Sequence, residues 1–184
     1  MKIFFKTLFA ALLLSFATLT ANAQDVELDL ENTLYLDLVD GRVVIKMFPE
    51  VAPNHVARIK ELTRQGFYDG IIFHRVIEGF MAQTGDPEGT GRGGSGQNLD
   101  AEFSDMPHYK GMVSMARGTE PNSADSQFFI CLGYSPHLDG QYSLWGEVVS
   151  GIRYVDKIKV GVVNQGFEDP SKILKMQVAA DVKE

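Results

Sequence analysis

The chain has 184 residues, 45% of them hydrophobic, and its 24 acidic and 17 basic side chains give a net charge of −7. This acidic balance disfavours non-specific binding to nucleic acid or to anionic membranes, because both reward clustered Lys and Arg. The single cysteine, Cys131 in FFICL, excludes a disulfide within the chain. We expect it to be a small buried hydrophobe.

Residues 1–23 have the pattern of a cleavable secretory signal peptide. Lys2 and Lys6 precede a largely apolar run from Leu8 to Leu19, and Ala21-Asn22-Ala23 forms an A-x-A cleavage site. The apolar run is too short to span a bilayer, so we expect no membrane insertion. Residues 24–184 keep 15 basic and 24 acidic side chains, a net charge of −9. They are expected to form a single exported domain, in a bacterial periplasm or alternatively outside the cell.

A hairpin and a helix open the mature chain. Residues 33–48 alternate apolar and polar side chains around Asp40-Gly41, which predicts a β-hairpin with a tight turn. In the next segment, 49–66, Val56, Ile59 and Leu62 recur about once per helical turn before Gly66. This spacing predicts an amphipathic helix that ends at the glycine.

Short β-rich stretches separated by glycine-rich or polar turns make up most of the remaining chain. They lie at 71–77, 80–84, 112–116, 127–132, 143–149 and 173–178, and YVDKI (154–158) is expected to form a second, short helix. Many short strands with few helices favour an antiparallel barrel or sandwich over a doubly wound α/β fold.

The segment GTGRGGSG (89–96) contains Gly91-x-Gly93-x-x-Gly96, formally a dinucleotide-binding fingerprint. That motif needs a strand before it and a helix after it, and QNLDAEF (97–103) has no helical apolar period. A flexible surface loop is therefore favoured, and a nucleotide-dependent enzyme is the weakest alternative.

Metal and nucleophile chemistry receive no support from the motifs. The four histidines lack Cys or carboxylate partners at ligand spacing, so we expect no metal, and the serines in polar turns lack a G-x-S-x-G elbow. The histidines are His55, His74, His108 and His137, and the serines are Ser123, Ser126 and Ser135. We interpret His74 as a packed strand histidine.

One arginine lies in an unusually apolar setting in FHRVIEGFMAQTGD (73–86). Arg75 could simply lie over its neighbours' apolar surface, paired with Glu78, or it could be functional. Strand alternation places Met81 and Gln83 on one face, and likewise Gln127 and Phe129. Two strands would thus each present an apolar group and an amide beside a fixed cation, which favours a functional arginine.

Three segments in this order, FHRVIEGFMAQTGD, SMAR…PNSADSQFFI and HLDG…LWGEV, closely resemble the cyclophilin-type peptidyl-prolyl cis-trans isomerases, in particular an exported bacterial member. The resemblance extends from about Thr33 to Val178. It implies a mainly β fold, a closed eight-stranded antiparallel β-barrel capped by two α-helices, with a peptide groove on its outer face. It also implies catalysis without cofactor or metal, and we expect a monomer.

The family's site residues can be carried over position by position. The resemblance implies that Arg75 is catalytic, whereas the other positions contact proline-containing peptides or folding exported proteins. These substrate-binding residues are Phe80, Met81, Phe129 and Leu138 in a proline pocket, Gln83, Ala116, Arg117 and Gln127 along the peptide backbone, and His137 and Tyr142 at the rim. His137 stands where strong cyclosporin binders have tryptophan, and Tyr142 where many members have histidine, so cyclosporin binding is expected to be weak. Arg117 replaces a common asparagine.

The resemblance also implies a mechanism. Resonance holds an Xaa-Pro amide planar, and a twisted amide has a proline nitrogen that accepts hydrogen bonds better. A fixed guanidinium can donate to that nitrogen in the twisted form alone, which is selective binding of the transition state. The main alternative is a binding module that holds unfolded segments and isomerises them only incidentally.

Overall fold

The computed structural model describes residues 29–183, and within them one antiparallel sheet of nine strands supplies most of the fold. The expected signal peptide lies outside the described residues. The strands are β1 Thr33–Leu38, β2 Gly41–Met47, β3 Arg75–Ile77, β4 Met81–Thr84, β5 Met112–Met115, β6 Phe128–Cys131, β7 Leu144–Ser150, β8 Gly161–Val162 and β9 Lys175–Val178.

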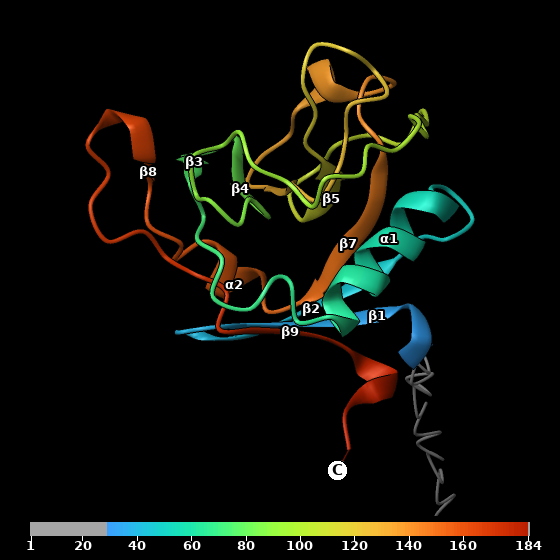
Figure 1. Cartoon of the computed structure of the whole chain (residues 1–184), viewed down its shortest axis with the longest axis horizontal. Helices are drawn as coiled ribbons and strands as arrows, with labels where there is room; N and C mark the ends of the chain where they lie inside the picture. The colour runs from blue at the N-terminus through green and yellow to red at the C-terminus, as the bar shows by residue number, and fades with distance from the viewer. Residues whose placement is uncertain (1–28, 184) are drawn as a thin grey trace, which may run out of the picture.

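Two α-helices flank the sheet (Figure 1), in agreement with the expected number. The longer one, α1 (Pro53–Arg64), packs against β9, and the single-turn α2 (Ile152–Val155) packs against β2. Four 3-10 helices complete the described elements, and they are η1 Leu30–Asn32, η2 Pro136–Leu138, η3 Val163–Gln165 and η4 Ala179–Asp181. No helix within residues 29–183 combines the length and apolar character needed to span a membrane.

The sheet curls but does not close. Its strand order is β8-β3-β4-β6-β5-β7-β2-β1-β9, and the edge strands β8 and β9 do not pair with each other. The expected closed eight-stranded barrel is therefore wrong, because the fold is an open, curled half-barrel of nine strands. Closure would run through residues 71–74, which meet residues 171–173 through one isolated bridge, Ile72–Lys172, and a few irregular hydrogen bonds instead of a ladder.

The predicted hairpin and amphipathic helix are both present. Strands β1 and β2 pair up to Leu38–Gly41, and α1 buries Val56, Ile59 and Leu62. The helix N-terminus receives its cap from a distant side chain, because both oxygens of the Glu102 carboxylate accept backbone N–H groups at the start of α1, each at 3.0 Å. The sequence pattern contained no signal for this contact.

Three short elements differ most from their sequence prediction, whereas the other predicted strands agree with the structure to within two residues at each end. Only residues 75–77 of the stretch 71–77 form a strand, because the ladder with β4 begins at Arg75. The second helix occupies 152–155 instead of 154–158, and it begins directly after Gly151, which has a positive φ of 84°. Strand β8 was missed because two residues are too few to show alternation.

Side chains in β4 and β6 alternate between two separate hydrophobic clusters. Ala82, Phe128 and Ile130 belong to the main core on the concave side, where the fully buried Trp145 packs edge-on against Phe128. The opposite face carries a smaller cluster with buried members Met81, Phe129, Cys131 and Leu138. The alternation predicted from the sequence is thus confirmed, and it places the candidate site on the outer face of the sheet.

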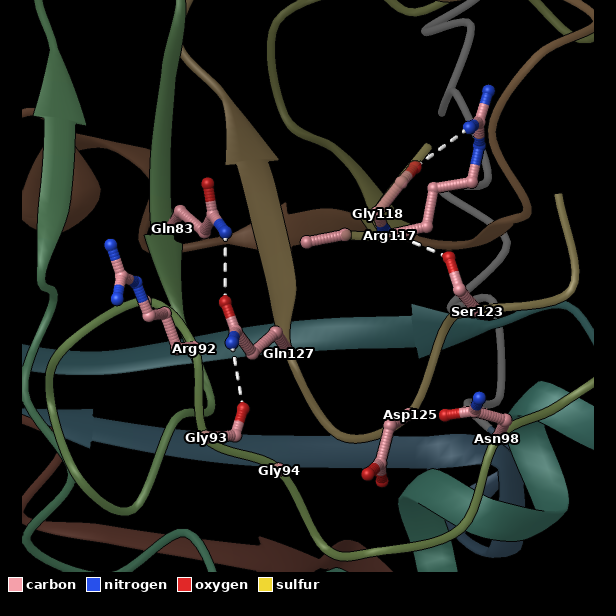
Figure 2. Close-up of a pocket in the computed structure, with 12 residues that line it drawn as sticks. Gln83, Arg92, Gly93, Gly94, Asn98, Arg117, Gly118, Ser123, Asp125 and Gln127 are labelled. Atoms are coloured by element: carbon pink, nitrogen blue, oxygen red, sulfur yellow. Dashed lines mark hydrogen bonds between the residues drawn. The ribbon is translucent and has the colours of Figure 1, made fainter. Parts of the chain in front are cut away.

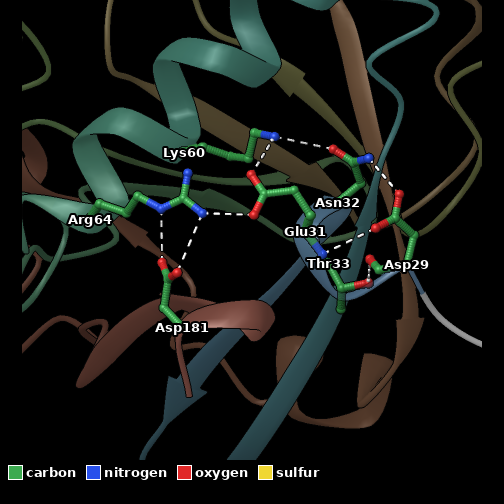
Figure 3. Close-up of polar contacts among 7 residues, drawn as sticks. All are labelled: Asp29, Glu31, Asn32, Thr33, Lys60, Arg64 and Asp181. Atoms are coloured by element: carbon green, nitrogen blue, oxygen red, sulfur yellow. Dashed lines mark hydrogen bonds and ion pairs between the residues drawn. The ribbon is translucent and has the colours of Figure 1, made fainter. Parts of the chain in front are cut away.

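Ion pairs tie the two ends of the described chain to α1 (Figure 3). Glu31 of η1 pairs with Lys60 at 3.0 Å and with Arg64 at 2.8 Å, and Arg64 also pairs with Asp181 of η4 at 2.8 Å. Hydrogen bonds from Arg64 and Lys60 lower the pKa of Glu31. These contacts hold η1 and η4 side by side at the end of α1.

Candidate active site

Strand register brings the predicted arginine, amide and aromatic ring into one row. Arg75 of β3 pairs with Gln83 of β4, and Gln83 in turn pairs with Phe129 of β6. Directly paired residues point to the same face of a sheet. Residues that are 54 positions apart in the sequence therefore lie side by side across three strands.

Arg75 lies against apolar groups and one amide. Its Nη1 is 3.6 Å from the Met81 sulfur and 3.5 Å from Oε1 of Gln83, and its guanidinium carbon is 5.9 Å from the centre of the Phe80 ring. Within residues 29–183 no carboxylate forms an ion pair with Arg75, so the pairing with Glu78 considered from the sequence is absent. A guanidinium has five N–H donors, which leaves most of them available to a ligand.

A cavity of about 140 Å³ lies beside this guanidinium. Its walls combine the apolar cluster of the outer face with three residues that have polar side chains, Arg75, Gln83 and Arg117. The lining residues are Arg75, Phe80, Met81, Gln83, Ala116, Arg117, Phe129, Leu138 and Tyr142, all of which belong to the predicted set. An apolar pocket with a few convergent polar groups is the usual form of a ligand site.

The two remaining predicted residues adjoin this cavity. The His137 ring lies 5.3 Å from the ring of Phe80, centre to centre, and Phe80 lines the cavity. Gln127 lines a larger neighbouring cavity of about 410 Å³, which shares Gln83, Ala116 and Arg117 with the first. The fold therefore brings together every site residue expected from the sequence.

Comparisons with known proteins agree with this geometry. The family model of the cyclophilin type peptidyl-prolyl cis-trans isomerases matches residues 33–178. The chain belongs to this family. A probable peptidyl-prolyl cis-trans isomerase from Brucella suis is 48% identical over 181 residues, which cover 91% of this chain and 90% of the relative.

Solved structures of cyclophilins are also similar to this chain. A cyclophilin from Hirschia baltica superposes with a TM-score of 0.77 and 31% identity, covering 85% of this chain and 77% of that chain. A Cryptosporidium parvum cyclophilin determined in the presence of the dipeptide Ala-Pro has a TM-score of 0.72 and 28% identity, covering 79% of this chain and 98% of that chain. This cyclophilin is accordingly an isomerase.

A buried histidine supports the aromatic wall of the cyclophilin's pocket. The rings of His108 and Phe129 stack with centres 6.4 Å apart, and Tyr142 meets Phe129 edge-on at 5.7 Å. Nδ1 of His108 lies 2.8 Å from Oδ1 of Asp139, and Nε2 lies 2.8 Å from the Ser114 hydroxyl. Burial opposes ionisation of Asp139, but hydrogen bonds with His108 hold the pKa of this carboxyl below its usual value.

The contact between His108 and Asp139 behind Phe129 was not predicted from the sequence. His108 was assigned no role, because the carboxylate partner is 31 residues away along the chain. The signal that could have found it is the Asp139 of HLDG, the residue directly after the pocket residue Leu138.

The guanidinium of Arg117 donates hydrogen bonds to backbone carbonyls of the protein itself. Nε donates to the carbonyl of Gln141 at 3.0 Å, and Nη1 donates to the carbonyls of Gly118 and Thr119 at 2.9 and 3.1 Å. Its carbon lies 4.8 Å from the centre of the Tyr142 ring. The side chain therefore joins two loops at the rim of the cavity, and its donors are largely used within the protein.

The glycine-rich loop lines the larger cavity (Figure 2). The next element after Gly96 is the strand β5, so the loop lacks the following helix that dinucleotide binding requires. Instead, the Gly93 carbonyl accepts a hydrogen bond from Nε2 of Gln127 at 2.8 Å. Gly91 and Gly93 of the fingerprint-like segment thus line the larger cavity.

Cys131 and His74 are buried groups without a chemical role in the cavity. Cys131 is fully buried, which confirms the expected small buried hydrophobe, and burial raises the pKa of its thiol to about 12. Burial also lowers the pKa of His74, and the charge of Arg75 lowers it further while Asp86 opposes this. Among residues 29–183, no cluster of three or more His, Cys, Asp or Glu is arranged to hold a metal ion.

Proposed function

We propose that this isomerase accelerates rotation about Xaa-Pro bonds by stabilising the twisted amide with Arg75. The observation that carries the proposal is an Arg75 guanidinium without an ion-pair partner in residues 29–183, facing an apolar cavity formed by Phe80, Met81, Phe129 and Leu138. The cavity seats the proline ring and keeps water from competing for the arginine. Further support comes from the related cyclophilin that was crystallised in the presence of Ala-Pro.

The energetics are consistent with one main donor assisted by binding contacts. Left alone, an Xaa-Pro bond turns over in roughly tens to hundreds of seconds. Bringing this to milliseconds requires about 10⁴- to 10⁵-fold acceleration, or roughly 5.5–7 kcal/mol. One preorganised donor supplies roughly 2.7–4 kcal/mol. The remainder comes from the pocket and from contacts of Gln83, Ala116, Arg117 and Gln127, which hold one side of the bond while the other rotates.

We also propose that the enzyme is exported and acts on exported proteins. A signal peptide at 1–23 would deliver residues 24–184 as one monomeric domain to the periplasm or, alternatively, to the extracellular medium, where proline-containing and folding exported proteins are its substrates. Fractionation of a bacterial host that expresses the full chain tests this. A periplasmic product that begins at Gln24 is the expected result, and an unprocessed cytoplasmic product contradicts it.

Exchange NMR of an Xaa-Pro peptide tests the catalytic part, because it needs no coupling protease. Fast exchange with the wild-type protein and slow exchange with a folded Arg75→Ala variant are expected. If the wild-type protein shows no isomerase activity but still suppresses the aggregation of unfolded proteins, the binding module is favoured instead.

A further inference from the structure

An oriented chain of hydrogen bonds leads from the glycine loop to Arg75. The Gly93 carbonyl accepts from Nε2 of Gln127 at 2.8 Å, and Oε1 of Gln127 accepts from Nε2 of Gln83 at 2.9 Å (Figure 2). Oε1 of Gln83 then faces Nη1 of Arg75 at 3.5 Å. A carbonyl can only accept and a guanidinium can only donate, so these two ends together fix which way both amides point.

The orientation of the amides matters because each amide has one accepting and one donating end. Without the Gly93 carbonyl, Gln127 and Gln83 could both turn over and keep their mutual hydrogen bond. Gln83 would then present its NH₂ group to Arg75, and two donors repel each other. The Gly93 carbonyl therefore favours the orientation in which Gln83 presents its oxygen to the guanidinium.

The carboxylate of Asp86 holds this part of the loop. Asp86 is 1% exposed and accepts hydrogen bonds from the backbone N–H groups of Gly91 at 2.5 Å and Glu88 at 2.8 Å, and from the Thr90 hydroxyl at 3.3 Å. Burial alone would raise the pKa of Asp86, but hydrogen bonds from Glu88, Gly93, Gly91 and Thr90 lower it overall. The carboxylate is therefore charged at neutral pH.

Gly93 packs directly on this carboxylate. A methyl group added at Gly93 would overlap Oδ1 of Asp86, so a residue with a side chain does not fit here unless the carboxylate moves. Any change in the carboxylate that releases the N–H groups of the loop moves the Gly93 carbonyl as well.

We propose that Asp86 is a positioning residue for Arg75, acting through Gly93, Gln127 and Gln83. It does not touch the substrate cavity lined by Arg75, and its effect passes through the loop and the two amides. This inference rests on the proposed catalytic role of Arg75. It adds that Asp86 sets the orientation of the Arg75 guanidinium.

The test compares Asp86→Asn with a matched control, Asp69→Asn. Asn has the shape of Asp but turns one acceptor into a donor that faces the N–H groups of the loop. Asp69 also accepts a backbone N–H group, that of Met176 at 2.9 Å, but lines neither cavity of the site. Exchange NMR with an Xaa-Pro peptide gives kcat and KM for each variant.

For Asp86→Asn we expect kcat to fall by about 10- to 100-fold, the scale of a small misplacement of a reacting group. KM should stay within about twofold, because the proline pocket is intact. Asp69→Asn should retain the wild-type kcat. A wild-type kcat in Asp86→Asn, or an equal loss in the control, overturns the inference.

A double variant separates positioning from general destabilisation. If Asp86 acts through Arg75, Asp86→Asn should cost nothing further in an Arg75→Ala background, whereas independent effects would multiply. Gly93→Ala displaces the loop while leaving Asp86 unchanged, because the added methyl group would overlap the carboxylate. It should therefore lower kcat as Asp86→Asn does. This second variant provides the test if Asp86→Asn does not fold.

The side-chain NH₂ signals of Gln83 and Gln127 report on the hydrogen-bonded relay from Gly93 through Gln127 and Gln83 to Arg75. They do so independently of catalytic activity. Asp86→Asn should shift both ¹⁵N signals, and Asp69→Asn should leave them in place. Unchanged amide signals overturn the inference even if Arg75 is catalytic. Conversely, a wild-type rate in Arg75→Ala with shifted amide signals would reject the proposed mechanism while the hydrogen-bonded relay stands.

Discussion

Arg75 and Gln83 are direct partners in the β3–β4 ladder, and their side chains face each other with Nη1 and Oε1 3.5 Å apart. The arginine thus lies against a neutral acceptor instead of a carboxylate. A carboxylate would satisfy the guanidinium and compete with a ligand for its donors. A single amide oxygen orients the cation and leaves it free to act on the substrate.

Arg75→Ala should keep the fold and lose about two to three decades of kcat/KM, the value of one preorganised donor. Arg75 is only half-buried, so its removal leaves the core intact. Exchange NMR with an Xaa-Pro peptide measures the rate, and circular dichroism checks the fold. Arg42→Ala serves as the control, because Arg42 pairs with Asp37 at 2.7 Å away from the site. A wild-type rate in Arg75→Ala would remove the arginine from its role.

The isomerisation rate should be nearly flat between about pH 6 and 8, because the proposed mechanism uses neither a general acid nor a general base. A pH series of the same exchange measurement checks this. A bell-shaped profile in that window would instead indicate acid–base catalysis by His74 or His137.

The pH dependence of stability should report on His74. Its pKa is lowered in the folded state, so the unfolded chain binds the proton first as pH falls. The free energy of unfolding is therefore unaffected by His74 above about pH 6.5, the unfolded value, and decreases as pH drops below it towards the folded pKa. Urea unfolding at several pH values should show a shallower decrease for His74→Gln. Equal slopes in the two proteins would contradict this assignment.

His137→Trp should strengthen cyclosporin binding by about tenfold or more, the value of one additional hydrogen bond from an indole N–H together with its larger apolar surface. The ring of His137 lies beside that of Phe80 at the edge of the pocket, so the larger ring would extend the same wall. Calorimetric titration of both proteins measures the change. Equal affinities would mean that another position limits drug binding.

Glu31→Gln should lower the free energy of unfolding by no more than about 1 kcal/mol, because its pairs with Lys60 and Arg64 are largely exposed. The difference from wild type should shrink in about 1 M salt, which screens such pairs. Glu50→Gln provides the control, since Glu50 takes part in no ion pair among the described residues. A salt-independent difference would indicate a packing effect instead.

The sequence predicted well the elements whose signal lies in neighbouring residues. The hairpin around Asp40-Gly41, the apolar face of α1 and the alternation in β4 and β6 depend on side-chain spacing within about a dozen residues. It also placed Met81 with Gln83 and Gln127 with Phe129, because alternation along a strand needs no knowledge of the partner strand.

Contacts between distant segments could not be predicted from the sequence pattern. The Glu102 carboxylate caps α1 from 47 residues away, and Asp139 supports His108 from 31 residues away. Neither pair has a local pattern, because its partners meet only after the loops between them have folded. The open edge of the sheet has the same origin, since residues 71–74 have strand-like composition but pair irregularly with residues 171–173.

The sequence by itself therefore determined the family, the faces of the strands and the identities of the pocket residues. Only the tertiary structure decided that Arg75, Gln83 and Phe129 form one row, that the amides point in one direction and that Asp86 holds the loop behind them. The physical reason is that periodicity is a property of one segment, whereas register and hydrogen-bond direction depend on several segments packed together.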